Sequence, residues 1–83
     1  MANRRMFSRD VVETDRFLGM PLTSQALYFH LGMEADDAGC VPSPRKVQRA
    51  VGRTEGDLKH LASCGYIIPF ESGVIVIAHW KQS

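Results

Sequence analysis

The sequence predicts one small α+β domain, with three to four short helices followed by a C-terminal β-hairpin. Two patterns carry this prediction. Apolar residues recur at helical spacing between residues 24 and 64, and capping residues bound each such segment. Residues 66–80 are rich in β-branched and aromatic residues on either side of a tight turn. A chain of 83 residues holds one domain, and its 45% hydrophobic and 23% charged residues are ordinary globular values.

The first helical segment is expected between Ser8 and Leu18. Ser8 is a good N-cap, and the segment has a partly apolar face, although its valines and Thr14 fit a helix interior poorly. That face comprises Val11, Val12, Asp15 and Leu18. Gly19 and Pro21 then interrupt the chain.

A central, mostly buried helix is predicted from Ser24 to about Ala35, with Thr23 or Ser24 as its N-cap. Its two adjacent apolar stripes are Leu27, Leu31 and Ala35, and Ala26, Phe29 and Met33. Turn residues at 36–39 end it, and residues 39–41 are long enough for a very short strand.

Residues 43–64 have the pattern of a helix-turn-helix. Ser43 is a good N-cap, Pro44 suits the first helical position, and Gly52 suits the position after the last. Val47, Ala50 and Val51 form the expected buried face of this helix, and Arg45, Lys46 and Arg49 point away from it.

A three-residue turn leads to the second helix of the pair. Thr54 is its expected cap, Asp57 completes a partial capping box, and Gly65 follows its end. The inner face of this helix is expected to be Leu58, Leu61 and Ala62. Two short amphipathic helices joined in this way are typical of helix-turn-helix units.

The last part of the chain is expected to form strands at 66–70 and 74–80. A loop at Ser72-Gly73 would pair Phe70 with Ile75 and Ile68 with Ile77, giving one apolar face for the helices to cover. Pro69 would then lie on an edge strand. Tyr66, Phe70 and Trp80 are assigned to core packing in preference to base stacking.

The order of these elements predicts a winged helix-turn-helix. Residues 1–83 form the single domain, 43–64 the helix-turn-helix and 66–80 the wing, and 1–9 are a candidate basic arm. Arginines of that arm could reach a minor groove, or Met6 and Phe7 could dock on a partner subunit, and the sequence does not separate these alternatives.

The distribution of charge points to a polyanion. Net charge is only +1, but residues 42–53 carry four cations and no acid. The candidate DNA-binding residues are Arg45, Lys46, Arg49 and Arg53, then Lys59, His60 and Ser63 of the next helix, and Arg4 and Arg5 of the arm. Contact with phosphates is favoured over a merely solvated helix face. Glu55 and Asp57 open the second helix and Glu71 lies at the wing tip, so a single copy is expected to bind with modest affinity.

Other classes of function lack support in the sequence. No nucleophile elbow, phosphate-binding loop or metalloprotease motif is present, so we expect neither an enzyme nor a cofactor. No two of the three histidines and two cysteines are expected to lie at the spacing of about two to five residues that is typical of structural zinc sites, so no metal site is expected. The cysteines are expected to be reduced thiols. Neither a signal peptide nor a membrane span is expected.

Several stretches also resemble a known family. These are Arg-Arg-Met-Phe-Ser at 4–8, Met-Pro-Leu-Thr-Ser-Gln-Ala-Leu-Tyr-Phe-His-Leu at 20–31, Ala-Asp-Asp at 35–37, Asp-Leu-Lys at 57–59, Ile-Ile-Pro-Phe-Glu-Ser-Gly-Val at 67–74, and His79-Trp80. Together they are similar to the N-terminal domain of phage replisome organisers, the replication initiation proteins of phages and prophages of Gram-positive bacteria, which are related to DnaD-type primosome proteins. Ala38 and Cys40 depart from the second acid and the aromatic that family members often carry there.

The resemblance implies duplex binding at a replication origin in the bacterial cytoplasm, self-association into a homo-oligomer, and a C-terminal region that engages helicase-loading proteins. Because this chain stops at Ser83, we expect either a part of a longer protein or a stand-alone version. Two alternatives remain: an interaction or oligomerisation module of the primosome without DNA contact, and a winged-helix transcriptional regulator.

Overall fold

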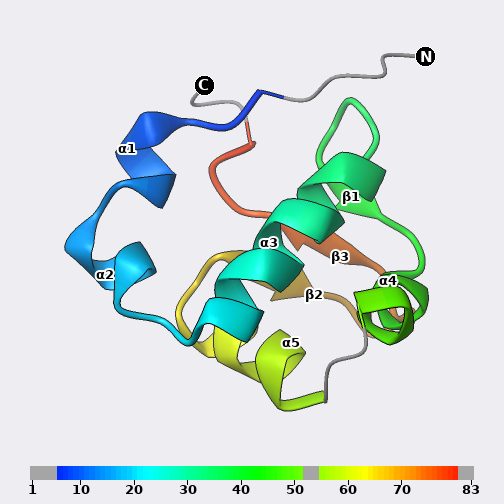
Figure 1. The fold of residues 1–83 in the computed structure, drawn as a ribbon. Coiled ribbons are helices and arrows are strands. Elements are labelled where there is room, and N and C mark those ends of the chain that lie inside the picture. Colours follow the sequence, from blue (N-terminus) through cyan, green and yellow to red (C-terminus); the bar gives the residue numbers. More distant parts are fainter. Residues whose placement is uncertain (1–5, 52–54, 81–83) are drawn as a thin grey trace.

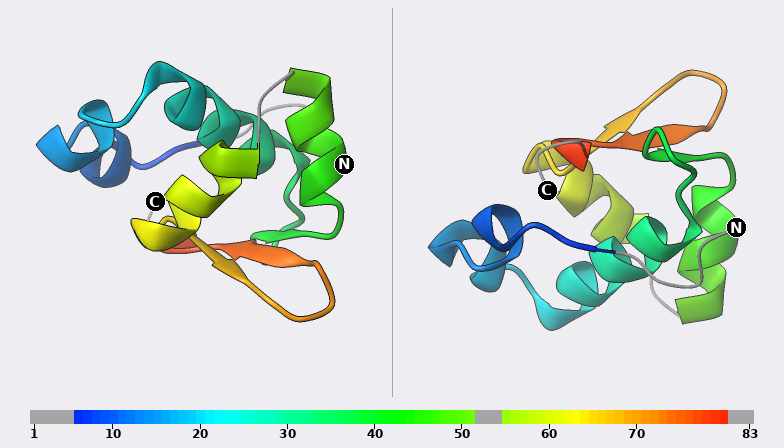
Figure 2. Two further views of the ribbon diagram at one scale, coloured as in Figure 1. Left: turned by 90° about the horizontal axis from the view of Figure 1, so that it is seen from below. Right: turned by 90° about the horizontal axis from the view of Figure 1, so that it is seen from above.

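The computed structural model describes residues 6–51 and 55–80. These residues form a small α+β structure with five helices and a three-stranded antiparallel sheet of strand order β1-β3-β2 (Figure 1). The helices are α1 (Arg9–Val12), α2 (Asp15–Leu18), α3 (Leu22–Glu34), α4 (Pro44–Val51) and α5 (Glu55–Ser63), and the strands are β1 (Cys40–Val41), β2 (Ile67–Pro69) and β3 (Ile75–Ile77). The two views in Figure 2 show the helices gathered on one side of the sheet. This architecture confirms the α+β class, and it is compatible with a winged helix.

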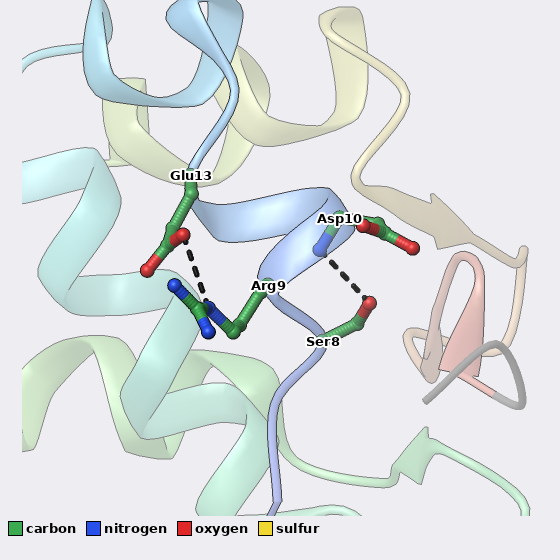
Figure 3. A network of polar contacts seen from close by, with 4 residues as sticks. All are labelled: Ser8, Arg9, Asp10 and Glu13. Carbon is green, nitrogen blue, oxygen red and sulfur yellow. Dashed lines mark hydrogen bonds and ion pairs between the residues drawn. The ribbon is translucent and has the colours of Figure 1, made fainter.

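The first helical segment is divided into α1 and α2, where the sequence predicts one helix. Ser8 caps α1 as expected, because its Oγ accepts a hydrogen bond from the backbone N–H of Asp10 at 3.2 Å (Figure 3). Helix α1 ends with Glu13 as its C-cap, and Thr14 caps α2 by accepting a hydrogen bond from the N–H of Phe17 at 3.1 Å. A residue that fits a helix interior poorly therefore becomes a cap. Because the segment is broken at residues 13 and 14, its buried face differs from the predicted one. Phe17 is buried, whereas Leu18, which was assigned to the apolar face, is 57% exposed.

Helix α3 begins at Leu22, two residues before the predicted start. Pro21 occupies the N-cap position without a side-chain hydrogen bond, so the expected capping by Thr23 or Ser24 is wrong. One predicted stripe is buried, comprising Leu27, Leu31 and Ala35. The second buried stripe is Ser24, Tyr28 and Gly32, whereas Met33 of the predicted stripe is exposed. Hydrophobicity alone predicts the wrong second stripe, because the buried one consists of a serine, a tyrosine and a glycine.

Phe7 covers that second stripe. Its ring centroid lies 5.0 Å from that of Phe29 and 6.1 Å from that of Tyr28. The ring also lies over Gly32, where a Cβ atom would come within 2.4 Å of Phe7 Cε1. Phe7 is therefore packed on its own domain, and Met6 beside it is exposed. The candidate arm at 1–9 cannot include Phe7 to Arg9, and Arg4 and Arg5 lie outside the described residues.

The C-terminal hairpin forms where predicted, but its register differs by one residue. Ile67 pairs with Ile77 and Pro69 with Ile75, and β2 is an edge strand as expected. The loop holds three residues instead of two: the N–H of Phe70 bonds to Val74 O, and the N–H of Gly73 bonds to Phe70 O, with φ of +93° at Gly73. A shift of one residue moves a side chain to the opposite face of a sheet.

This register places Ile68 and Phe70 on the outer face, where Phe70 is 54% exposed, so the expected core packing of Phe70 is wrong. Tyr66 is buried, as predicted, and its ring packs edge-on against those of Phe17 and Tyr28. Burial, followed in size by the effect of Tyr66, raises the pKa of Tyr28 above its ordinary value. Trp80 lies past β3 and donates its indole N–H to Asp37 O at 3.0 Å.

His79 also lies past β3, in a turn at φ of 59°, and is not the predicted strand residue. The short strand at β1 does form, pairing Cys40 with Val76 and Val41 with Ile75. Both cysteines are free thiols and half-buried.

Candidate nucleic-acid interface

Helix α4 presents its cations to solvent. Arg45, Lys46 and Arg49 are all exposed, as predicted. The buried residues of this helix are Pro44 and Gln48, and Gln48 is only 5% exposed. Since residues four apart share a stripe of an α-helix, Arg45 and Arg49 form one stripe directly beside the buried one.

The predicted buried face of α4 is wrong in part. Val47 and Val51 are half-buried at the edge of the core, and Ala50 is exposed. The helix is therefore turned by about one stripe from the expected orientation, with a glutamine in the core. Hydropathy places glutamine outside and valine inside, so no local signal in the sequence indicates this orientation.

Helix α5 agrees more closely with its prediction. Leu61 is fully buried, and Leu58 and Ala62 pack against the core. Lys59 and Ser63 share an exposed stripe, and His60 is half-buried. Gly65 has φ of +83°, and the N–H groups of Gly65 and Tyr66 bond to Ala62 O and Leu61 O, which closes the helix as a Schellman motif. Arg53 and Thr54 lie outside the described residues.

Asp57 joins α5 to α3. The hydroxyls of Thr23 and Ser24 both donate to its Oδ1 atom at 2.9 Å. Ser24 is fully buried, so this carboxylate supplies the hydrogen-bond acceptor for a hydroxyl inside the domain. Thr23 and Ser24 belong to the first turn of α3, where a negative charge is favourable. The carboxylate expected in a capping box thus holds α5 on α3.

Arg16, which is not among the residues predicted from the sequence, fixes the other end of α5. Its guanidinium donates to the carbonyl of Cys64 and lies 5.4 Å from the centroid of the Tyr66 ring. Arg9 of α1 forms an ion pair of 3.2 Å with Glu13, the C-cap residue of that helix (Figure 3). These two arginines thus have contacts within the fold. The Arg16 contact joins residues 48 apart in the chain, so no short-range sequence pattern predicts it.

The wing contributes no cation to the interface. Residues 67–77 contain no lysine or arginine, and Glu71 and Ser72 are exposed at its tip. Among the described residues, the exposed lysines and arginines therefore all lie on the helices. The candidate interface is the exposed face of α4, with Arg45, Lys46 and Arg49, together with Lys59 and Ser63 of α5.

The prediction that no two histidines or cysteines are closely spaced is wrong for one pair. His60 and Cys64 are four residues apart, and His60 Nε2 lies 3.7 Å from Cys64 Sγ. Within the described residues, no three His, Cys, Asp or Glu side chains are grouped to hold a metal ion. Over the same residues, no helix is both long and apolar enough to cross a bilayer.

Comparison of the chain with protein-family models, with curated proteins and with solved structures found no match.

Proposed function

We propose that the chain is a winged-helix DNA-binding domain of a replication initiation protein. The observation that carries this proposal is the outward display of Arg45, Lys46 and Arg49 on α4, beside the buried Pro44–Gln48 stripe. Cations on an exposed helix face neutralise phosphates and release counterions, which supplies most of the affinity of DNA-binding proteins.

The order of elements supports a winged helix. In that arrangement α3 is the supporting helix, α4 and α5 are the helix-turn-helix, and β2–β3 is the wing. Helix α5 would enter the major groove, with Lys59 and Ser63 on its exposed stripe as contacts to bases or phosphates. The carboxylate of Asp57 is bound to α3 hydroxyls, so it is not available to read a base.

The place of this activity in replication rests on the sequence resemblance to phage replisome organisers. This resemblance implies that the chain binds duplex DNA at an origin in a bacterial cytoplasm and forms a homo-oligomer. It also implies helicase-loading proteins as further partners. The wing lacks cations, so one copy binds modestly, and a second copy or a second domain raises the overall avidity.

A second candidate function is an assembly module that does not touch DNA. Its supporting observation is the outer face of the sheet, where Ile68 and Phe70 are about half exposed. Large apolar side chains gathered on a surface are typical of sites that contact another protein.

Removing the α4 stripe distinguishes the two functions. We expect Arg45→Gln with Arg49→Gln to weaken duplex binding by about 100-fold in low-salt fluorescence anisotropy, because two phosphate contacts are lost. Arg9→Glu is the matched control, since it changes net charge by the same amount on α1. Thermal unfolding checks that both variants fold. Unchanged binding by the double variant would reject the DNA-binding proposal and leave the assembly module.

A further inference from the structure

The end of α5 brings a histidine and a cysteine together on one stripe of the helix. His60 Nε2 lies 3.7 Å from Cys64 Sγ. Both side chains are half-buried, so part of each is open to solvent. Thiolate sulfur and imidazole nitrogen are two of the ligand types that bind zinc in proteins. The pair therefore has the chemistry of two metal ligands.

The separation of the two atoms matches the geometry of a tetrahedral ion. Zinc binds sulfur at about 2.3 Å and imidazole nitrogen at about 2.0–2.1 Å. With a tetrahedral angle of about 109°, these bond lengths place the two ligand atoms about 3.6 Å apart. The observed 3.7 Å agrees with this within the tolerance of about 0.2 Å by which metal sites are judged. One ion can thus bind both atoms without a change in their separation.

The fold holds both residues in place before an ion binds. The backbone N–H of Cys64 donates to His60 O at 3.0 Å, which keeps this turn helical. Gly65 closes the helix, and the guanidinium of Arg16 donates to the carbonyl of Cys64. Because these contacts already fix the backbone, binding has little conformational entropy to remove from it.

The charges at the pair set the strength and the selectivity of the site. Two protein ligands leave two tetrahedral positions for water, and Arg16 places a positive charge nearby. The thiol proton is released to solvent when the ion binds, so the thiolate offsets part of the charge of the ion. We therefore expect a weaker affinity than that of a site with four protein ligands. Thiolate and imidazole favour zinc-like ions over magnesium and calcium, which prefer oxygen ligands.

We propose that His60 and Cys64 form a two-ligand site for zinc, or for a divalent cation of the same class, at the C-terminal end of α5. The Cys64 thiolate and Nε2 of the neutral imidazole bind the ion, and water fills the other positions. The ion links residues i and i+4, so it stabilises the last turn of the helix. Neither side chain is part of the candidate nucleic-acid interface, so the proposal is independent of DNA binding.

Cobalt(II) is the probe that tests this site. It replaces zinc in tetrahedral sites, and a sulfur-to-cobalt charge-transfer absorption band arises only when a thiolate binds the ion. The full chain is titrated with cobalt(II) without DNA or chelating buffer, and zinc is then added. The wild type should develop the band, saturate at one ion per chain, and lose the band to zinc but not to magnesium.

Variants assign the ligands, and thermal unfolding checks that each one folds. Cys64→Ser should abolish the band. His60→Gln should weaken cobalt binding by about 10-fold or more, since even the hydrogen-bond partners of metal ligands change affinity by about 10–100-fold. Cys40→Ser is the matched control, because Cys40 is the other half-buried free thiol, and it should bind as the wild type does. Cys64→His makes a pair of imidazoles at the same spacing, and it should bind zinc in calorimetry without showing the cobalt band.

Four results would each overturn the proposal. They are the absence of the band in the wild type, its persistence in Cys64→Ser, its loss in Cys40→Ser, and wild-type affinity for cobalt in His60→Gln.

Discussion

Replacing Phe7 with alanine is expected to lower the free energy of unfolding by about 2 kcal/mol. Truncating a buried phenylalanine costs about 3–5 kcal/mol, and Phe7 is half-buried. Its ring packs on Tyr28, Phe29 and Gly32 and ties the start of the chain to α3. In a domain with about 4–12 kcal/mol of total stability, this is a large fraction.

Gly32→Ala tests the same contact from the other side. In the wild type it should destabilise by an amount approaching that of Phe7→Ala, because the new Cβ would lie 2.4 Å from Phe7 Cε1 and displace the ring. In the Phe7→Ala background the sign should reverse. Alanine then stabilises the helix by up to about 1 kcal/mol, since glycine is the poorer helix former.

Urea unfolding of the wild type, the two single variants and the double variant measures this double-mutant cycle. Additive costs, with Gly32→Ala destabilising both backgrounds equally, would show that Phe7 does not occupy the site over Gly32 in solution.

Replacing Asp57 with alanine is expected to cost about 2–3 kcal/mol. The substitution removes the shared acceptor of two hydroxyls, one of which is on the fully buried Ser24. Hydrogen bonds to a charged group contribute about 1.5–3 kcal/mol each, and a buried donor without a partner adds its own cost. Asp57 is half-buried, so water recovers part of the loss.

Asp57→Asn is the matched control, because its carbonyl oxygen keeps an acceptor in place. It should cost clearly less than alanine in the same urea titrations. Glu13→Ala, which changes an exposed acid, should stay within about 0.5 kcal/mol of the wild type. If Asp57→Ala were as mild as Glu13→Ala, the link between α3 and α5 would contribute nothing to stability.

Short-range chemistry made much of the fold predictable. Ser8 caps α1, Pro44 opens α4, and Gly65 at positive φ ends α5, and each of these is decided within a few residues of the chain. The hairpin was located for the same reason. Its register was not, because one extra loop residue, Glu71, changes which side chains face the core.

Long-range contacts were not predictable from the sequence. Phe7 over Gly32, Asp57 with Ser24, and Arg16 with Cys64 each join segments that are distant in the chain. At the candidate interface, exposure of the α4 cations follows from their charge. The burial of Gln48 depends on how α4 meets the rest of the domain, which a helical pattern alone does not fix.

The salt dependence of duplex binding tests the proposed interface most directly. Four exposed cations, namely Arg45, Lys46, Arg49 and Lys59, predict that the logarithm of the binding constant falls with the logarithm of salt concentration at a slope of about −3.6. Arg45→Gln with Arg49→Gln should reduce the magnitude of this slope by about 2. A slope near zero, or one that the double variant leaves unchanged, would contradict contact between this face of α4 and DNA phosphates.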